Sequence, residues 1–216
     1  MSKIDVINKL IDCGVVAVVR AENEDQALKI ADACAKAGIV GIEITFTVPG
    51  ALKIIERLAS EYAGGEMLVG AGTVLDKETA RAAILAGAQY VVSPCLDVET
   101  VQLCNAYNVP CMPGAMTVKE AVDGMKAGAD VIKIFPGGLF GPKIIKNFKG
   151  PLPQMKMMPT GGVDVSNIGE WIRAGAVAVG AGSSLTAGAK TGDYASITEV
   201  GKQMVAEVKK AREQMK

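Results

Sequence analysis

Short apolar segments alternate with amphipathic helical segments along the whole chain of 216 residues. Successive apolar segments start 20 to 26 residues apart, which is the length of one strand followed by one helix. Runs that are apolar on both faces are typical of parallel strands covered by helices. The pattern therefore predicts an α/β fold with eight strand–helix units. The apolar segments start at Val15, Gly41, Met67, Tyr90, Cys111, Val131, Met155 and Ala176.

Eight such units in one short chain favour a closed (β/α)₈ TIM barrel, as a single domain over residues 1–216. The alternative is an open, doubly wound sheet. The Gly-rich turn of a dinucleotide-binding sheet is missing, because the sequence RAEN at residues 20–23 follows the first apolar segment. We expect residues 2–13 to form an extra N-terminal helix that closes the bottom of the barrel, and residues 197–214 to form the last helix.

Both ends of the predicted helices carry sequence markers. Four helical stretches end in an Ala-Gly pair just before a strand, where glycine suits the left-handed C-terminal cap. Three others start with a polar residue that can accept a hydrogen bond from the first turn. The Ala-Gly pairs begin at Ala37, Ala86, Ala127 and Ala174, and the N-caps are Asp76, Asp97 and Thr117.

Composition excludes several classes of function. Histidine is absent, which excludes a Ser-His-Asp triad, a Cys-His pair and a His-built metal site. The 23 basic and 23 acidic residues balance, so neither a nucleic acid nor an anionic membrane is expected as a partner. The chain lacks an apolar run of about 18 residues and a signal-peptide pattern. Five cysteines without Cys-x-x-Cys spacing indicate reduced thiols, so we expect a cytoplasmic protein.

Two charged residues lie in apolar segments where the alternation of side chains points them into the barrel. Lys133 shares a strand face with Val131 and Phe135, while its isoleucine neighbours take the other face. Glu43 shares a face with Gly41 and is also flanked by isoleucines. Burying such charges is costly unless they are paired or functional.

These two residues allow a structural and a catalytic interpretation. The structural one is a buried ion pair. In the catalytic one, desolvation favours the neutral amine of Lys133, which attacks a keto group to give an imine. Glu43 then moves the protons that imine and enamine formation require.

Further candidates follow the ends of the strands, where barrel enzymes place their chemistry. Arg20 ends the first apolar segment and is either a solvated loop residue or a clamp for a carboxylate. Thr73 directly follows the third apolar segment and can either bind substrate or cap the next turn.

The last two strands end in glycine-containing loops. Barrels often bind phosphate at this position, through backbone N–H groups and hydroxyls. Glycine also makes tight turns, but its presence at both strand ends favours phosphate. The sequences are Thr160-Gly161-Gly162 and Gly182-Ser183-Ser184.

On these segments the chain resembles the KHG/KDPG aldolase family, whose KDPG substrate is 2-keto-3-deoxy-6-phosphogluconate. The similarity spans nearly the whole chain, and the segments appear in family order. They read VVAVVR, GIEITF, VGAGTV, VVSP, MPGAMT, VIKIFP, PTGGV and VGAGSS.

The resemblance implies a role for each matching residue. Lys133 corresponds to the Schiff-base lysine, and Glu43 to the general acid/base. The pyruvate end of the site corresponds to Thr73 and Pro94, with Phe135 on the same strand as the lysine. The phosphate end corresponds to Thr160, Gly161, Gly162, Gly182, Ser183 and Ser184. The resemblance also implies a cytoplasmic homotrimer with no metal and no organic cofactor.

One position departs from the family pattern. Some members carry an arginine four residues after the strand-two glutamate, where this chain has Thr47. We count Thr47 among the substrate-binding candidates, and Arg20 can supply a guanidinium from the adjacent strand.

The resemblance, together with the inward-facing Lys133 and Glu43, thus implies a class I aldolase that reversibly cleaves KDPG to pyruvate and glyceraldehyde 3-phosphate. One alternative is a sister aldolase for 4-hydroxy-2-oxoglutarate or 2-keto-3-deoxy-6-phosphogalactonate. Others are a phosphosugar isomerase or epimerase, and a non-catalytic barrel that binds a phosphorylated metabolite.

Overall fold

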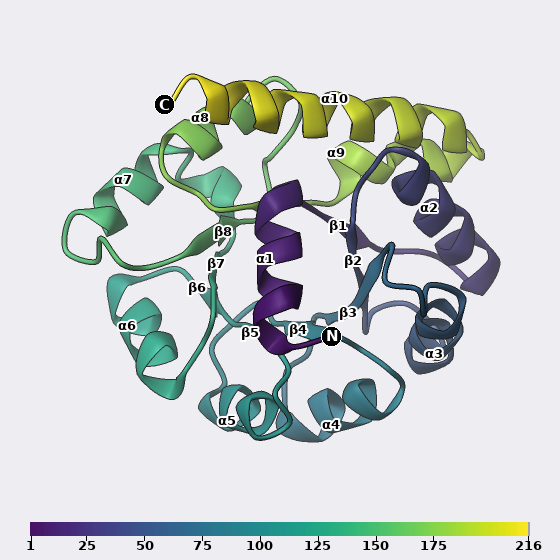
Figure 1. Cartoon of the computed structure of the whole chain (residues 1–216), viewed down its shortest axis with the longest axis horizontal. Coiled ribbons are helices and arrows are strands. Elements are labelled where there is room, and N and C mark those ends of the chain that lie inside the picture. The colour runs from purple at the N-terminus through teal and green to yellow at the C-terminus, as the bar shows by residue number, and fades with distance from the viewer. Residues whose placement is uncertain (216) are drawn as a thin grey trace.

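The computed structural model describes residues 1–215, so Lys216, the last residue of the predicted single domain, lies outside the described residues. Strands and helices alternate from β1 onward, and the helices surround the strands (Figure 1). The strands are β1 (Val15–Val19), β2 (Gly41–Thr45), β3 (Leu68–Gly72), β4 (Tyr90–Val92), β5 (Cys111–Met112), β6 (Gly114–Ala115), β7 (Ile132–Ile134), β8 (Met157–Pro159) and β9 (Val179–Ala181). The α-helices are α1 (Lys3–Cys13), α2 (Glu24–Lys36), α3 (Ala51–Glu61), α4 (Lys77–Leu85), α5 (Val98–Ala106), α6 (Val118–Ala127), α7 (Lys143–Lys149), α8 (Ile168–Arg173), α9 (Ser183–Thr186) and α10 (Tyr194–Glu213). Two 3₁₀ turns, η1 (Gly137–Leu139) and η2 (Ala187–Thr191), follow β7 and α9.

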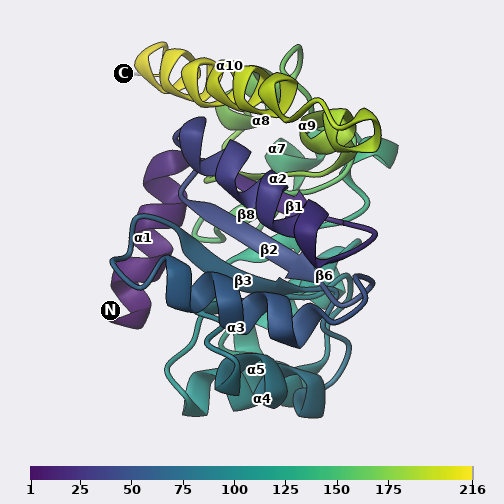
Figure 2. The same cartoon turned by 90° about the vertical axis from the view of Figure 1, so that its right-hand side faces the viewer.

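The strands form two sheets in which every pair is parallel. Six strands pair in the order β5-β4-β3-β2-β1-β9, and three pair in the order β6-β7-β8. A bridge between Thr160 and Gly180 connects the end of β8 to β9. The six-stranded sheet curls, with α2 and α3 packed outside β1, β2 and β3 (Figure 2). The chain therefore has an α/β fold with a curled parallel sheet.

Each predicted apolar segment contains a strand, but the segment from Cys111 to Ala115 contains two. Pro113 separates β5 from β6, because proline has no N–H to donate to a ladder. Its carbonyl still accepts a hydrogen bond from the Lys133 N–H at 2.9 Å. One chain segment therefore belongs to both sheets, pairing with β4 on one side and β7 on the other.

The predicted helix caps are confirmed. The side chains of Asp76, Asp97 and Thr117 each accept a hydrogen bond from the backbone N–H three residues later. The glycines of the four Ala-Gly pairs all have the positive φ that a left-handed cap requires. They are Gly38, Gly87, Gly128 and Gly175, with φ of 80°, 97°, 96° and 109°.

Two apolar clusters occupy the two faces of the strands. The outer cluster contains Ile42, Ile44, Ile132 and Ile134 and packs against the helices. The second cluster lies on the opposite face, which we call the inner face. It contains Val6, Leu10, Val16, Leu68, Tyr90, Val92, Met112, Val131, Met158 and Ala178. The strand residues therefore alternate between the two clusters, as the sequence pattern predicts.

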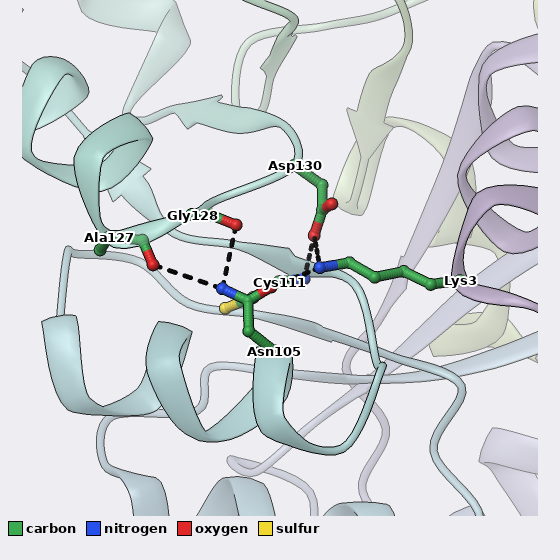
Figure 3. Close-up of polar contacts among 6 residues, drawn as sticks. All are labelled: Lys3, Asn105, Cys111, Ala127, Gly128 and Asp130. Carbon is green, nitrogen blue, oxygen red and sulfur yellow. Dashed lines mark hydrogen bonds and ion pairs between the residues drawn. The ribbon is translucent and has the colours of Figure 1, made fainter.

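The N-terminal helix α1 lies beside the starting ends of the strands, and its residues Val6 and Leu10 pack into the inner-face cluster (Figure 2). A polar network also holds it there (Figure 3). Lys3 forms a half-buried ion pair with Asp130 at 2.9 Å and donates to the Asn105 side chain. The same Asp130 carboxylate accepts from the Cys111 N–H at 3.2 Å. This network fixes the helix to the segments around α5, β5 and β7.

Candidate active site

Lys133 and Glu43 face each other from opposite strands on the inner face. Lys133 is the middle residue of β7, and Glu43 is the middle residue of β2. The Lys133 Nζ lies 3.8 Å from Glu43 Oε1, and the two side chains are 6% and 1% exposed. The ring centroid of Phe135 lies 5.2 Å from the Lys133 Nζ. The structure thus brings together the two charges that the sequence pattern points inward.

Glycine on the neighbouring strand makes room for the Glu43 side chain. A Cβ atom at Gly72 would lie 2.9 Å from Glu43 Oε1 and 3.1 Å from its carboxyl carbon. Such separations are too short for a real side chain, so the carboxylate rests directly on the backbone of β3. The sequence places Gly72 in the segment GAGT, but its contact with Glu43 is visible only in the structure.

The buried Glu43 carboxylate lacks the hydrogen bonds that normally stabilise a buried charge. Within residues 1–215, neither of its oxygens has a hydrogen-bond partner. Burial raises the pKa of the Glu43 carboxyl above its ordinary value of 4.5, while the charges of Lys133 and then Arg20 lower it. Burial dominates because it removes the carboxylate from water. A carboxyl group in this state can take up and release protons closer to neutral pH than an exposed glutamate does.

A cavity of about 180 Å³ opens at the ends of β8 and β9. Its lining contains Arg20 and Phe135, together with all six residues predicted at the phosphate end. These are Thr160, Gly161, Gly162, Gly182, Ser183 and Ser184. The residues predicted at the phosphate end are therefore neighbours around one cavity.

The two loops around this cavity are held by specific contacts. Gly161 and Gly162 both have positive φ, at 87° and 72°. The Asn167 side-chain amide donates to the Gly162 carbonyl at 2.8 Å, and the Ser184 hydroxyl donates to the Val163 carbonyl at 2.5 Å. The second contact joins the loop after β8 to the start of α9.

Thr160 has a buried hydroxyl that lacks a partner in the described part of the chain. Its Oγ1 lies only 2.3 Å from the position that a Cβ atom at Gly180 would take, so Gly180 is needed for Thr160 to point inward. Thr160 itself is one of the residues that line the cavity.

The other predicted substrate-binding residues lie outside the cavity lining. Thr47 is exposed, and its hydroxyl lies 2.7 Å from that of Thr45, which is itself buried on β2. Thr73 follows β3 with a φ of 57°, and Pro94 follows β4. The Pro94 carbonyl lies so close to Gly114 that a Cβ atom there would be 2.1 Å from it.

Four further residues of the cavity lining carry no motif that marks them as site residues. These are Val18, Val163, Asp164 and Gly180. Strand alternation could have indicated Val18 and Gly180, since each lies two residues before a predicted site residue on the same strand face. The position of Val163 and Asp164 depends on the loop conformation, which has no periodic signal.

The described residues contain no group of three His, Cys, Asp or Glu side chains placed to hold a metal ion. Among helices within residues 1–215, none combines the length and apolar character that crossing a membrane requires.

Comparison with known proteins gives a consistent result. The profile of the KDPG and KHG aldolase family matches residues 6–200. The chain is 34% identical over 200 residues to the 2-dehydro-3-deoxy-6-phosphogalactonate aldolase of Escherichia coli K12, covering 92% of this chain and 95% of that protein. It is 35% identical over 168 residues to the 2-dehydro-3-deoxy-phosphogluconate aldolase of Haemophilus influenzae, covering 77% and 78%.

A solved structure supports the same assignment. The KDPG aldolase from Legionella pneumophila, with pyruvate captured as a covalent carbinolamine intermediate, superposes with a TM-score of 0.83. The two chains are 28% identical, and the match covers 91% of this chain and 97% of that one. Sequence, fold and the matching segments agree that this chain belongs to the KDPG and KHG aldolase family and is an aldolase, a lyase of carbon–carbon bonds.

Proposed function

We propose that this enzyme reversibly cleaves KDPG to pyruvate and glyceraldehyde 3-phosphate through a Schiff base on Lys133. The observation that carries the proposal is the buried pair of Lys133 and Glu43, 3.8 Å apart, with Lys133 two residues before Phe135, which lines a cavity of glycines and serines. The pair offers a nucleophile and a proton carrier, and the cavity offers backbone N–H groups and hydroxyls for an anion. The carbinolamine captured in the Legionella aldolase is the first covalent species that this chemistry requires.

The reaction starts with attack of the Lys133 amine on the C2 ketone, which gives a carbinolamine. Glu43 donates the proton that leaves with water, and the protonated imine becomes the electron sink. Glu43, now a carboxylate, takes the proton of the C4 hydroxyl as the C3–C4 bond breaks. The aldehyde leaves, and the electron pair of the C3–C4 bond forms the enamine of pyruvate. Protonation of the enamine at C3 and hydrolysis of the imine release pyruvate and restore Lys133.

The orientation of the substrate is fixed by binding both its carboxylate and its phosphate. The carboxylate of the pyruvate end binds near Arg20, whose guanidinium can form two hydrogen bonds to it. Thr47, Thr73, Pro94 and Phe135 complete this end. The phosphate of the aldehyde end binds between the loops after β8 and β9. Its partners there are Thr160, Gly161, Gly162, Gly182, Ser183 and Ser184.

A second candidate substrate is 2-keto-3-deoxy-6-phosphogalactonate, because the Escherichia coli relative is an aldolase for this C4 epimer. The unphosphorylated 4-hydroxy-2-oxoglutarate is a third. Rates of cleavage for these three compounds separate the candidates. A preference for either phosphorylated epimer supports the phosphate site, whereas equal rates without phosphate contradict it.

The assembly and the location of the enzyme are also proposals. We infer that the two sheets close into one (β/α)₈ barrel with α1 across its bottom, as one domain. The Thr160–Gly180 bridge and the shared segment around Pro113 support this. We further propose a homotrimer in the cytoplasm that works without metal or organic cofactor, and sedimentation of the purified enzyme tests the trimer.

The decisive experiment is borohydride reduction in the presence of pyruvate, followed by intact-mass measurement and peptide mapping. We expect a reduced pyruvyl adduct on Lys133 and no adduct in the Lys133→Ala variant. Folded protein without an adduct would reject the Schiff-base mechanism and favour an isomerase or a binding protein. An adduct without cleavage of any of the three candidates would reject only the substrate assignment.

A further inference from the structure

The loop after β8 rests on the 3₁₀ turn η1, which follows the strand that carries Lys133. We call this segment, residues 160–162, the β8 loop. β7 and β8 pair in parallel, so η1 and the β8 loop leave the same edge of the sheet. The Gly137 N–H donates to the Thr160 carbonyl at 2.8 Å and joins the two segments. The β8 loop lines the cavity, whereas no residue of η1 does.

The two segments meet backbone to backbone, with glycine on both sides. A Cβ atom at Gly137 would lie 2.9 Å from the Gly161 carbonyl oxygen and 3.2 Å from that of Thr160. A Cβ atom at Gly162 would lie 2.6 Å from Gly138 Cα. Gly162 also has a positive φ, but Gly137 does not, so at Gly137 the close contact alone requires glycine.

The surroundings of Gly137 leave the turn little room to yield. Gly137 is buried, and the Cη2 atom of Trp171 lies 3.5 Å from the position that its Cβ atom would take. Trp171 belongs to α8, is 1% exposed and packs in the outer cluster. Gly162 of the β8 loop is exposed. A methyl group at Gly137 would therefore displace the loop rather than the packed indole ring.

Phe135 connects this contact to Lys133. The Phe135 Cε2 atom lies 3.9 Å from the position of a Cβ atom at Gly161, and the ring centroid lies 5.2 Å from the Lys133 Nζ. Gly137 follows two residues later and contacts the same loop. The short segment from Lys133 to Gly137 therefore carries the reactive amine and touches the β8 loop at two places.

We propose that Gly137 is a positioning residue for the β8 loop, and that it determines selectivity for phosphorylated over unphosphorylated substrates. The inference rests on the phosphate site proposed for this loop. Backbone N–H donors move with the chain, so a displaced loop misaligns all of its hydrogen bonds to a phosphate at once. Gly137 does not touch the substrate, and its effect passes through the position of Gly161 and Gly162.

The test is Gly137→Ala, with kcat/KM measured for a phosphorylated substrate and for 4-hydroxy-2-oxoglutarate. The phosphorylated substrate is whichever C4 epimer the wild-type enzyme cleaves faster. We expect the ratio of the two kcat/KM values to fall about tenfold, mainly through a higher KM for the phosphorylated compound. Trapping of pyruvate on Lys133 by borohydride should match the wild type. A general loss of structure would instead lower the rates with both substrates.

Gly150→Ala is the matched control. Gly150 caps α7 with a φ of −52°, and a Cβ atom there would lie 3.5 Å from the Asn147 carbonyl oxygen, an ordinary contact. This variant should keep the wild-type ratio. A wild-type enzyme with equal kcat/KM for both substrates overturns the phosphate site and this inference together. A wild-type preference for the phosphorylated substrate that Gly137→Ala retains overturns the inference alone.

Amide hydrogen exchange in the wild-type enzyme gives a test that needs no variant. Opening of the contact with Thr160 exposes the Gly137 N–H, and a phosphate held by the β8 loop opposes that opening. Inorganic phosphate at about ten times its dissociation constant should therefore slow exchange of this amide by about tenfold. The Gly150 N–H, which donates to the Lys146 carbonyl at 3.1 Å, should not change. Bound phosphate that leaves the Gly137 amide unprotected overturns the inference, and failure of phosphate to bind overturns the phosphate site with it.

Discussion

The Lys133 Nζ lies 3.8 Å from Glu43 Oε1, across the inner face from β7 to β2, with both side chains almost completely buried. A pair of this kind is not an efficient way to stabilise a fold, because both charges lose their hydration. The lost hydration of Glu43 is not replaced, because no other described residue donates a hydrogen bond to its carboxylate oxygens. The pair therefore has consequences for activity and for stability that can be measured separately.

The first prediction concerns the role of Glu43 in turnover. The Glu43→Gln variant keeps the shape of the side chain but cannot exchange protons. We expect kcat to fall by about 10²- to 10⁴-fold, the usual contribution of a general acid/base. Slow trapping of pyruvate on Lys133 by borohydride should remain. Glu99→Gln, an exposed residue paired with Lys77, is the matched control and should retain full activity. Near-normal turnover in Glu43→Gln would refute the assignment.

The second prediction follows from the pKa of Glu43. Because burial raises this pKa above 4.5, the folded protein holds a proton at pH values where the unfolded chain has released it. The free energy of unfolding should therefore fall as pH rises from about 4.5 through the folded pKa, by up to about 1.4 kcal/mol per pH unit.

Glu43→Gln lacks this titration. Chemical denaturation from pH 4 to 8 should show the stability of the wild type decreasing relative to the variant as pH rises. A difference that stays constant across this range would contradict the direction of the pKa shift.

The third prediction uses the close contact between Gly72 and Glu43. In Gly72→Ala the new methyl group would lie 2.9 Å from Glu43 Oε1, so the carboxylate must move away from its place beside Lys133. We expect a loss of about 10- to 100-fold in kcat, because small displacements of a catalytic group are costly. Gly64→Ala is the control, since its nearest neighbour lies 3.9 Å away. Equal activities of the two variants would show that the position of the carboxylate is not critical.

The fourth prediction tests the phosphate end of the cavity. Ser184 donates to the Val163 carbonyl and so joins the two loops that line the cavity. Ser184→Ala should lower kcat/KM for KDPG by about tenfold, because loss of the contact with Val163 releases the two loops whose backbone N–H groups hold the phosphate. The rate with 4-hydroxy-2-oxoglutarate should change little. Ser60→Ala, on the exposed side of α3, should affect neither substrate. A loss of equal size for both substrates would argue against phosphate binding at these loops.

The fifth prediction concerns the network that holds α1. Asp130→Asn leaves Lys3 without its ion pair and weakens the contact with the Cys111 N–H. We expect the free energy of unfolding to fall by about 1 to 3 kcal/mol, since this pair is half buried. Asp25→Asn breaks an exposed pair with Lys29 and should cost less than about 0.5 kcal/mol. Catalytic constants should be unchanged in both variants. Loss of activity in folded Asp130→Asn would show that the network reaches the site.

Much of this architecture follows from local sequence rules. The alternation of apolar residues placed Lys133 and Glu43 on the inner face, because the side-chain period of a strand is two. The helix caps at Asp76, Asp97 and Thr117 followed from the chemistry of the first turn.

The remaining features depend on contacts between distant segments. The interruption at Pro113 depends on which neighbour each half of the segment pairs with. The close contact of Gly72 with Glu43 depends on strand register. The contact of the Thr47 hydroxyl with that of Thr45, 2.7 Å away, likewise depends on the turn after β2 rather than on any periodic signal.

The inner face is divided along the strands in a way that bears on how such an enzyme acquires new substrates. Val6 and Leu10 of α1 bind the apolar residues near the strand starts, whereas the cavity is built from loops after the strand ends. Substitutions in the loops after β8 and β9 therefore leave the packing beneath α1 intact. A directed-evolution library confined to these loops could exchange one acceptor aldehyde for another while the Lys133–Glu43 pair and the melting temperature are preserved.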